Sequence, residues 1–428
     1  MYVAPTIDWV PFSYPPFYYL VAWPFAQVMG VSFAPLRLVS AACSLATCLL
    51  LAWLVRRETG CGAAGVAAAG LYAACFRVAG AWFDTARVDA LFVFLVLAAI
   101  ALVRRGRGWR TAAGAGLALA LAAWTKQTAL ALVPALCLAA LDRPARGFVL
   151  GGVVTLTLGA LVAWEHAATE GWFTYYAWLL PRKHYEYGCA PEFWKQDVLG
   201  PLPVAAVLSV LALLGLLADL RWSFVGYALI GSALLGSTWI SRAHCGGYDN
   251  VLMPGCLALA LLSGLTLGHA PRLPRVGWLA GLVVWGALAV QLYWLRYDVT
   301  AQIPTSQDRA AGDDLVLRIS QTPGSVWVFS HSRYAASAGK PRLAHWMAIC
   351  DVLRDPEPGP ATKLSEQLTA AITWRRFGAV MLDDDYFPGP LGDHYVRAGP
   401  VYSAPNVLWP VTGHRTRPAW VWLPRVTP

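Results

Sequence analysis

Three ionisable residues stand close together between two long apolar runs. Asp84, Arg87 and Asp89 lie in the segment WFDTARVD at positions 82–89. Ionisable groups at membrane depth are costly and usually mark function. A carboxylate at a water–lipid boundary can act as a general base or hold an acceptor hydroxyl. The structural alternative is an aspartate that caps a helix and pairs with the arginine.

A second set of polar residues interrupts or follows other apolar runs, and its members are basic. They are Lys126, Arg182, Lys183, Lys195 and Arg242, with His184 and His244 beside them. Arginine forks and lysine point charges are what a phosphate or pyrophosphate requires. We therefore expect an anionic ligand near this set, whereas the alternative is charge held in water by long side chains that reach out of the lipid.

The elements that must position these residues are apolar helices. Hydrophobic residues make up 57% of the 428-residue chain and charged residues only 13%, against about 25% charged residues in an average soluble domain. The apolar blocks approach the ~20 residues that cross a bilayer. They cover 33–55, 61–82, 88–103, 111–141, 147–168, 199–218, 222–239, 248–268 and 276–296. Because TKQT at 125–128 splits the fourth block, we predict about ten crossings, and we expect 16–30 to be a partly embedded helix.

The arginines in the short loops predict orientation, because such loops are enriched in basic residues on the cytoplasmic side. The arginines of the loops at 56–57, 104–110, 143–146, 221 and 272–275 fall on one side if the blocks alternate and Lys126 stands at the tip of a hairpin. The net charge of +9 then reports orientation rather than a nucleic-acid partner. Asp84, Asp89 and the second basic set face outward.

The tail differs in composition from the apolar region. Charge rises after about residue 300, two short β-type runs appear at 325–330 and 379–382, and 362–376 has helical periodicity. We predict an all-α membrane domain over 1–298 and a small α/β domain over 299–428, outside the membrane. A disulfide between Cys189 and Cys245 would join two outer loops, with free thiols as the alternative. The acidic run at 383–385 suits a solvated loop better than a metal.

Four segments carry a resemblance to a known superfamily. They are SYPPFYY at 13–19, ARVDAL at 86–91, TKQT at 125–128 and SRAHCGGYDN at 241–250. With these motifs the chain resembles the GT-C superfamily of membrane glycosyltransferases, and most closely the family 39 type. That type includes protein O-mannosyltransferases and the lipid A aminoarabinose transferase.

The resemblance implies an active site on the periplasmic face of the bacterial inner membrane. There a sugar would pass, with inversion, from a polyprenyl-phosphate carrier to a lipid, glycan or protein acceptor. It implies that Asp89 matches the family's second acidic position and that Tyr14 replaces a lysine before the Pro-Pro pair. We assign catalysis to Asp89, Asp84 and Asp8, donor phosphate binding to Lys126, Arg182, Lys183 and Arg242, and substrate binding to Tyr14, Arg87, His184 and His244. No cofactor is required, and a divalent metal stays open.

The N-terminus departs from the family pattern. Members begin with an extra helix and an acidic residue in the first outer loop, so we expect the true start to lie upstream of Met1. Otherwise Asp8 substitutes for that acid, or the chain is inactive. Two other functions compete: a transporter or flippase for lipid-linked sugars, and a non-catalytic assembly subunit. Matching interrupted helices in two halves of the chain would favour a transporter, and only one interruption is visible.

Overall fold

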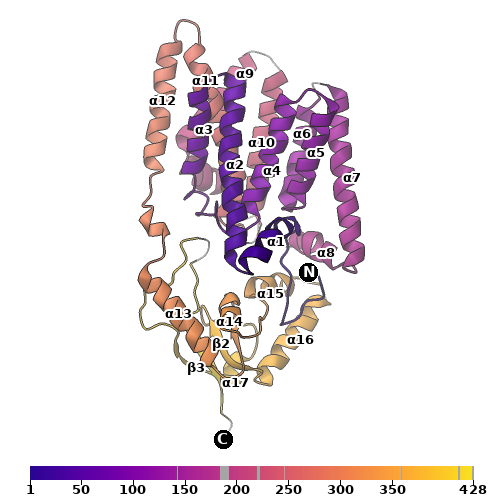
Figure 1. The fold of residues 1–428 in the computed structure, drawn as a ribbon, viewed down its shortest axis with the longest axis vertical. Coiled ribbons are helices and arrows are strands. Elements are labelled where there is room, and N and C mark those ends of the chain that lie inside the picture. Colours follow the sequence, from indigo (N-terminus) through magenta and orange to yellow (C-terminus); the bar gives the residue numbers. More distant parts are fainter. Residues whose placement is uncertain are drawn as a thin grey trace. The chain divides into compact units, whose positions relative to one another are not determined.

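The structure is a computed structural model that describes residues 1–141, 143–183, 192–218, 222–244, 246–357, 359–412 and 415–426 (Figure 1). The chain divides into two compact units. The first, which we call the membrane unit, comprises Tyr14–Trp164 and Tyr185–Tyr297. The second, the tail unit, comprises Met1–Ser13, Glu165–His184 and Asp298–Pro428. Predicted residues His184, Cys189 and Cys245 lie outside the described residues.

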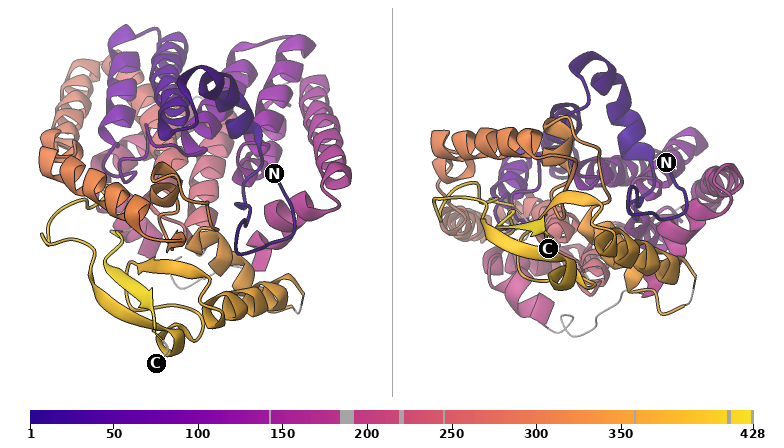
Figure 2. Two further views of the ribbon diagram at one scale, coloured as in Figure 1. Left: turned by 60° about the horizontal axis from the view of Figure 1, so that its bottom comes forward. Right: turned by 90° about the horizontal axis from the view of Figure 1, so that it is seen from below.

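The membrane unit consists of helices that run alongside one another (Figure 2). Its helices are α1 (Phe17–Met29), α2 (Phe33–Thr59), α3 (Gly62–Ala74), α4 (Asp89–Arg105), α5 (Trp109–Ala123), α6 (Val133–Ala139), most of α7 (Pro144–Ala168), α9 (Pro203–Ala218), α10 (Trp222–Arg242), α11 (Met253–His269) and α12 (Gly277–Trp294). Short 3-10 helices precede α6 (η1, Gln127–Leu132) and α11 (η6, Asp249–Leu252).

Several of these helices suit a bilayer. Among the described residues, four helical segments are long and apolar enough to cross a membrane: Phe33–Thr59, Pro144–Ala168, Asp249–Arg272 and Gly277–Trp294. Three shorter apolar helices accompany them, at Gly62–Ala74, Gln127–Ala139 and Pro203–Leu216. Helix α1 exposes large apolar side chains, including Trp23 and Val28, which fits the partly embedded helix expected there. The count of ten crossings stays a prediction.

Helix α11 forms the centre of the membrane unit, since every residue from Met253 to Gly268 is buried. Such a helix is apolar all round because all its faces meet protein. Two glycines spaced four apart permit close approach. A Cβ at Gly264 would lie 2.7 Å from Cβ of Ala68 on α3, and one at Gly268 would lie 2.4 Å from Cβ of Thr59 on α2. Small residues at this spacing let membrane helices pack backbone to backbone.

The tail unit contains a four-stranded sheet in the order β1-β2-β4-β3. Strands β1 (Ser325–Val328) and β2 (Phe377–Leu382) are parallel, whereas β4 (Trp420–Pro424) is antiparallel to both β2 and β3 (Tyr395–Pro400). The two β-type runs predicted from the sequence are β1 and β2. Strands β3 and β4 were not predicted; β3 carries Gly and Pro, which are depleted in strands.

The tail unit also contains α-helices. They are α8 (Trp172–Thr174), α13 (Ser306–Gln321), α14 (Arg333–Ser337), α15 (Trp346–Leu353), α16 (Pro360–Thr373) and α17 (Leu391–His394). The predicted helix at 362–376 corresponds to α16, which buries Leu364, Leu368, Ala371 and Ile372. The N-terminal segment belongs to this unit, because Ala344 donates a backbone hydrogen bond to Ile7 (2.9 Å).

Candidate active site

The start of α4 carries a buried carboxylate. Asp89 is the first residue of this helix and is 1% exposed. Negative charge at a helix N-terminus is favoured by the helix dipole. The N-cap position is Val88 and makes no side-chain capping bond, so Asp89 does not act as the cap that the structural alternative required.

The positive charge that balances Asp89 belongs to Lys126, which lies in a break in the helix after α5. Helix α5 ends at Ala123, and Lys126 adopts an extended backbone (φ −149°, ψ 123°) before η1 begins. Its ammonium group donates to Asp89 Oδ1 at 2.6 Å, and the side chain is only 7% exposed. The interruption predicted at Lys126 is therefore real. Asp89 and Lys126, expected to act separately as base and phosphate ligand, form one buried ion pair.

Asn250 completes the contacts of Asp89. It lies in η6, directly before the central helix α11, and its amide donates to Asp89 Oδ1 at 3.0 Å. Both described partners of the carboxylate therefore use the same oxygen. Oxygen Oδ2 is buried and has no hydrogen-bond partner among the described residues. Sequence reasoning missed Asn250, although a lone amide at the start of the apolar block 248–268 was the available signal.

Arg87 lies two residues before Asp89 and is held by aromatic rings rather than by an acid. Its guanidinium carbon lies 5.1 Å from the ring centre of Trp82 and 5.4 Å from that of Tyr14, and Nη2 donates to the Tyr14 hydroxyl at 3.1 Å. Such contacts attract a cation without neutralising it. Nε of Arg87 is buried without a partner within the described chain, and no ion pair of Arg87 occurs there.

Two other predicted residues of the membrane unit form ion pairs with oppositely charged side chains. Asp84 forms an exposed ion pair with Arg37 on α2. Arg242 makes a bidentate contact with Asp197, at 2.9 and 2.8 Å, and lies 3.3 Å from Asp249. His244 follows two residues later, after the end of α10. The charge of Arg242 is thus already balanced, whereas Lys126 and Arg87 carry two positive charges against the single carboxylate of Asp89.

Three predicted residues belong to the tail unit. Lys183 contacts Asp355 at 2.7 Å and Glu357 at 3.1 Å, and the hydrogen bond to Asp355 raises the pKa of Lys183. Arg182 is exposed beside it. Asp8 pairs with Arg376 at 2.6 Å and is about half exposed. Among the described residues of the chain, no group of three His, Cys, Asp or Glu side chains is arranged to hold a metal ion.

Comparison with known proteins identifies the family. The model of glycosyltransferase family 87 matches residues 12–262, which include the whole Asp89–Lys126–Asn250 cluster. The chain belongs to glycosyltransferase family 87. This is a GT-C-type family, so the superfamily expected from the sequence is confirmed. Comparison with curated protein sequences gives no match.

Two solved structures with a similar fold are ArnT and an oligosaccharyltransferase. ArnT from Cupriavidus metallidurans, solved bound to undecaprenyl phosphate, is 13% identical with a TM-score of 0.54, over 100% of the family 87 chain and 90% of ArnT. The oligosaccharyltransferase of Archaeoglobus fulgidus, solved with zinc and sulfate, is 13% identical with a TM-score of 0.50, over 88% of this chain and 60% of that one. At this identity the likeness establishes the fold.

Proposed function

We propose that this family 87 chain transfers a sugar from a polyprenyl-phosphate carrier to an acceptor hydroxyl, with inversion, at the periplasmic face of the bacterial inner membrane. The observation that carries the proposal is the buried Asp89–Lys126 pair, 2.6 Å long, in a helical membrane unit. A buried ion pair is seldom kept for stability alone, because its desolvation cost is comparable to its attraction. Membership of a glycosyltransferase family supports the chemistry.

Asp89 is the proposed general base. Lys126 and Asn250 both contact Oδ1 and fix the carboxylate, so Oδ2 is the oxygen available to accept the proton of the acceptor hydroxyl. The acceptor oxygen then bonds to the anomeric carbon while the bond from that carbon to the phosphate oxygen breaks. Attack opposite the leaving phosphate inverts the anomeric centre. The proton resides on Asp89, and the carrier leaves as polyprenyl phosphate.

Arg87 and Lys126 are the proposed ligands of the donor phosphate. Charge that develops on the departing phosphate must be stabilised by cations already in place. Arg87 forms no ion pair in the described chain, and Lys126 shares its single carboxylate with Asn250. We assign Arg242 and Lys183 to structural roles instead, because Asp197 and Asp355 already hold them.

Transfer is tested with the purified full-length chain in lipid nanodiscs, a panel of radiolabelled polyprenyl-phosphate pentoses and hexoses as donors, and a mixture of lipid, glycan and peptide hydroxyls as acceptors. We expect release of polyprenyl phosphate, and loss of a general base should slow it about 10²–10⁴-fold in Asp89→Asn. Glu58→Gln is the matched control, because Glu58 of α2 also forms a largely buried ion pair, with Arg104. Arg104 lies about 22 Å from Asp89 along α4. Full activity of Asp89→Asn refutes the site. Movement of the lipid-linked sugar across the bilayer without transfer would indicate a transporter.

The proposed face is tested by cysteine labelling in intact cells. In a cysteine-free background, Val426→Cys reports the tail, where Val426 is 93% exposed, and Val276→Cys reports the loop before α12, where Val276 is 53% exposed. We expect an impermeant maleimide to label position 426 in intact cells and position 276 only after permeabilisation. The reverse pattern would place the tail in the cytoplasm.

A further inference from the structure

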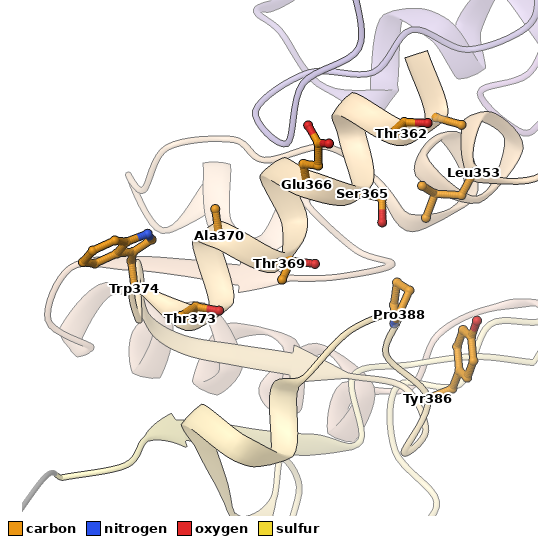
Figure 3. A pocket seen from close by; sticks show the side chains of 11 residues that line it. Leu353, Thr362, Ser365, Glu366, Thr369, Ala370, Thr373, Trp374, Tyr386 and Pro388 are labelled. Carbon is orange, nitrogen blue, oxygen red and sulfur yellow. The ribbon is translucent and has the colours of Figure 1, made fainter. Parts of the chain in front are cut away.

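The tail unit has an open groove of about 850 Å³ between α16 and the loop that follows β2. Four hydroxyl-bearing residues of α16 line it: Thr362, Ser365, Thr369 and Thr373. Their spacing places them along one side of the helix, next to the side that buries Leu364 and Leu368. In Figure 3, Ser365 and Thr369 point from α16 toward the loop that carries Tyr386 and Pro388.

Exposed aromatic rings complete the lining. Trp374, at the C-terminal end of α16, is 83% exposed, and Tyr386 is 61% exposed. What is informative is that both rings line the same groove, because exposed apolar surface that lines a groove marks a binding site more often than a single exposed side chain does. These two rings therefore indicate a ligand with flat apolar faces.

The loop that carries Tyr386 is fixed in place. The carboxylate of Asp384 accepts a hydrogen bond from the backbone N–H of Tyr386 at 2.9 Å. The next residue, Phe387, packs on Phe329 and Trp327, with ring centres 4.9 and 5.8 Å apart. Tyr386 is thus held toward solvent by an anchored neighbour, and a ring fixed before binding loses little entropy when a ligand stacks on it.

The charge and polarity of the lining define the ligand class. Among the described residues of the lining, Glu366 is the only carboxylate and no side chain is basic, so a phosphate or an acidic polymer is disfavoured. The hydroxyl-bearing residues Thr362, Ser365, Thr369 and Thr373 are exposed along the groove. Threonine is a poor helix former, so three of them on an exposed helix face suggest a binding role. Hydroxyls beside aromatic rings match a neutral carbohydrate, whose own hydroxyls hydrogen-bond and whose ring C–H faces stack.

We propose that this groove binds a neutral oligosaccharide, the glycan acceptor of the transfer reaction. The hydroxyl row from Thr362 to Thr373 spans about 16 Å, which suits a short chain of sugars better than a single ring. The acceptor role rests on the proposed function, whereas carbohydrate binding by the groove does not. A peptide is the competing occupant, and the variants below distinguish the two.

Binding is measured on the full-length chain by saturation-transfer difference NMR, in a detergent without a sugar headgroup so that the detergent cannot compete. The probes are neutral gluco-, manno-, galacto- and arabino-oligosaccharides of about five units. We expect one series to bind, with Trp374→Leu and Tyr386→Ala each weakening it about tenfold, the order of one aromatic contact. Trp374→Phe keeps a ring and should retain most of the affinity. Leu317→Ala is the control, since Leu317 is 54% exposed elsewhere in the tail unit.

The outcomes separate the two proposals. Equal affinity in Trp374→Leu and Trp374→Phe would show that apolar area rather than ring stacking matters, which favours a peptide and overturns the carbohydrate proposal. Failure of all four series to bind also overturns it, while leaving the transfer assay of Asp89→Asn unaffected. Binding that persists in Asp89→Asn supports the groove, even if that variant proves active and the proposed function fails.

Discussion

The buried pair of Asp89 and Lys126 allows its structural and catalytic contributions to be measured separately. Asp89 is 1% exposed and Lys126 6%, and their contact is 2.6 Å. Removing one partner leaves the other charge buried without compensation, which typically costs about 3–5 kcal/mol. Removing both charges restores neutrality, so the double variant should be much more stable than the sum of the single losses implies.

The test is a double-mutant cycle that compares the wild type with Asp89→Asn, Lys126→Met and the variant carrying both substitutions. Each single variant should unfold at a lower temperature than the wild type, and the double variant should recover most of the loss. The coupling between residues in direct contact amounts to roughly 0.5–3 kcal/mol. Transferase activity should follow a different pattern. All three variants should lose about 10²–10⁴-fold in rate, because the double variant has neither the base nor the phosphate ligand.

Two assays on the same nanodisc samples measure these effects. Thermal unfolding, followed by tryptophan fluorescence, reports stability, and release of polyprenyl phosphate reports the transfer rate. The control pair is Glu58 and Arg104, 3.4 Å apart and each about an eighth exposed. Its double neutralisation should leave the rate within about threefold of wild type. The reasoning fails if the Asp89→Asn, Lys126→Met protein regains both stability and activity, since the pair would then be only a structural contact.

Two further predictions concern stability. Gly268→Val should destabilise the membrane unit by about 1–3 kcal/mol, because a Cβ there would lie 2.4 Å from Thr59 of α2. Gly286→Val is the control, because a Cβ at Gly286 meets nothing within 4 Å. Thermal unfolding compares the two variants, and equal melting temperatures would contradict the prediction. Burial raises the pKa of Asp351 in α15 from 3.8 to about 6, although the charge of Arg354 lowers it. The folded tail unit therefore holds the Asp351 proton more tightly than the unfolded chain does. The tail unit should lose stability as the pH rises from about 4 to 6. Asp351→Asn should flatten the melting temperature across that range, and an unchanged slope would refute the assignment.

The parts of the site that the sequence could predict are those governed by local pattern. A polar segment inside an apolar run must break a membrane helix, and the break occurs at Lys126. An acid that begins an apolar run tends to lie at a helix N-terminus, as Asp89 does. These signals depend on neighbours within one or two helical turns, and the printed sequence shows them directly.

The partners of these residues could not be predicted, because tertiary packing chooses them. Asp89 meets Lys126 across 37 positions and Asn250 across 161. The helix order alone leaves many such pairings open. For the same reason Arg242 was expected to bind a donor phosphate rather than an acid. Its partner Asp197 lies 45 positions before it, in a segment with no visible motif.

The contact between Asp89 and Lys126 also affects the order in which the donor and the acceptor bind. In the resting chain the ammonium of Lys126 is held by Asp89 Oδ1 at 2.6 Å, so the carboxylate is engaged in an ion pair before any donor binds. A donor phosphate beside Lys126 and Arg87 would compete with Asp89 for the ammonium and so release the carboxylate from the ion pair. The donor should therefore bind first and activate the base for the acceptor. Initial-rate and product-inhibition kinetics should show an ordered mechanism, and acceptor binding that is equally tight with and without the donor would contradict this coupling.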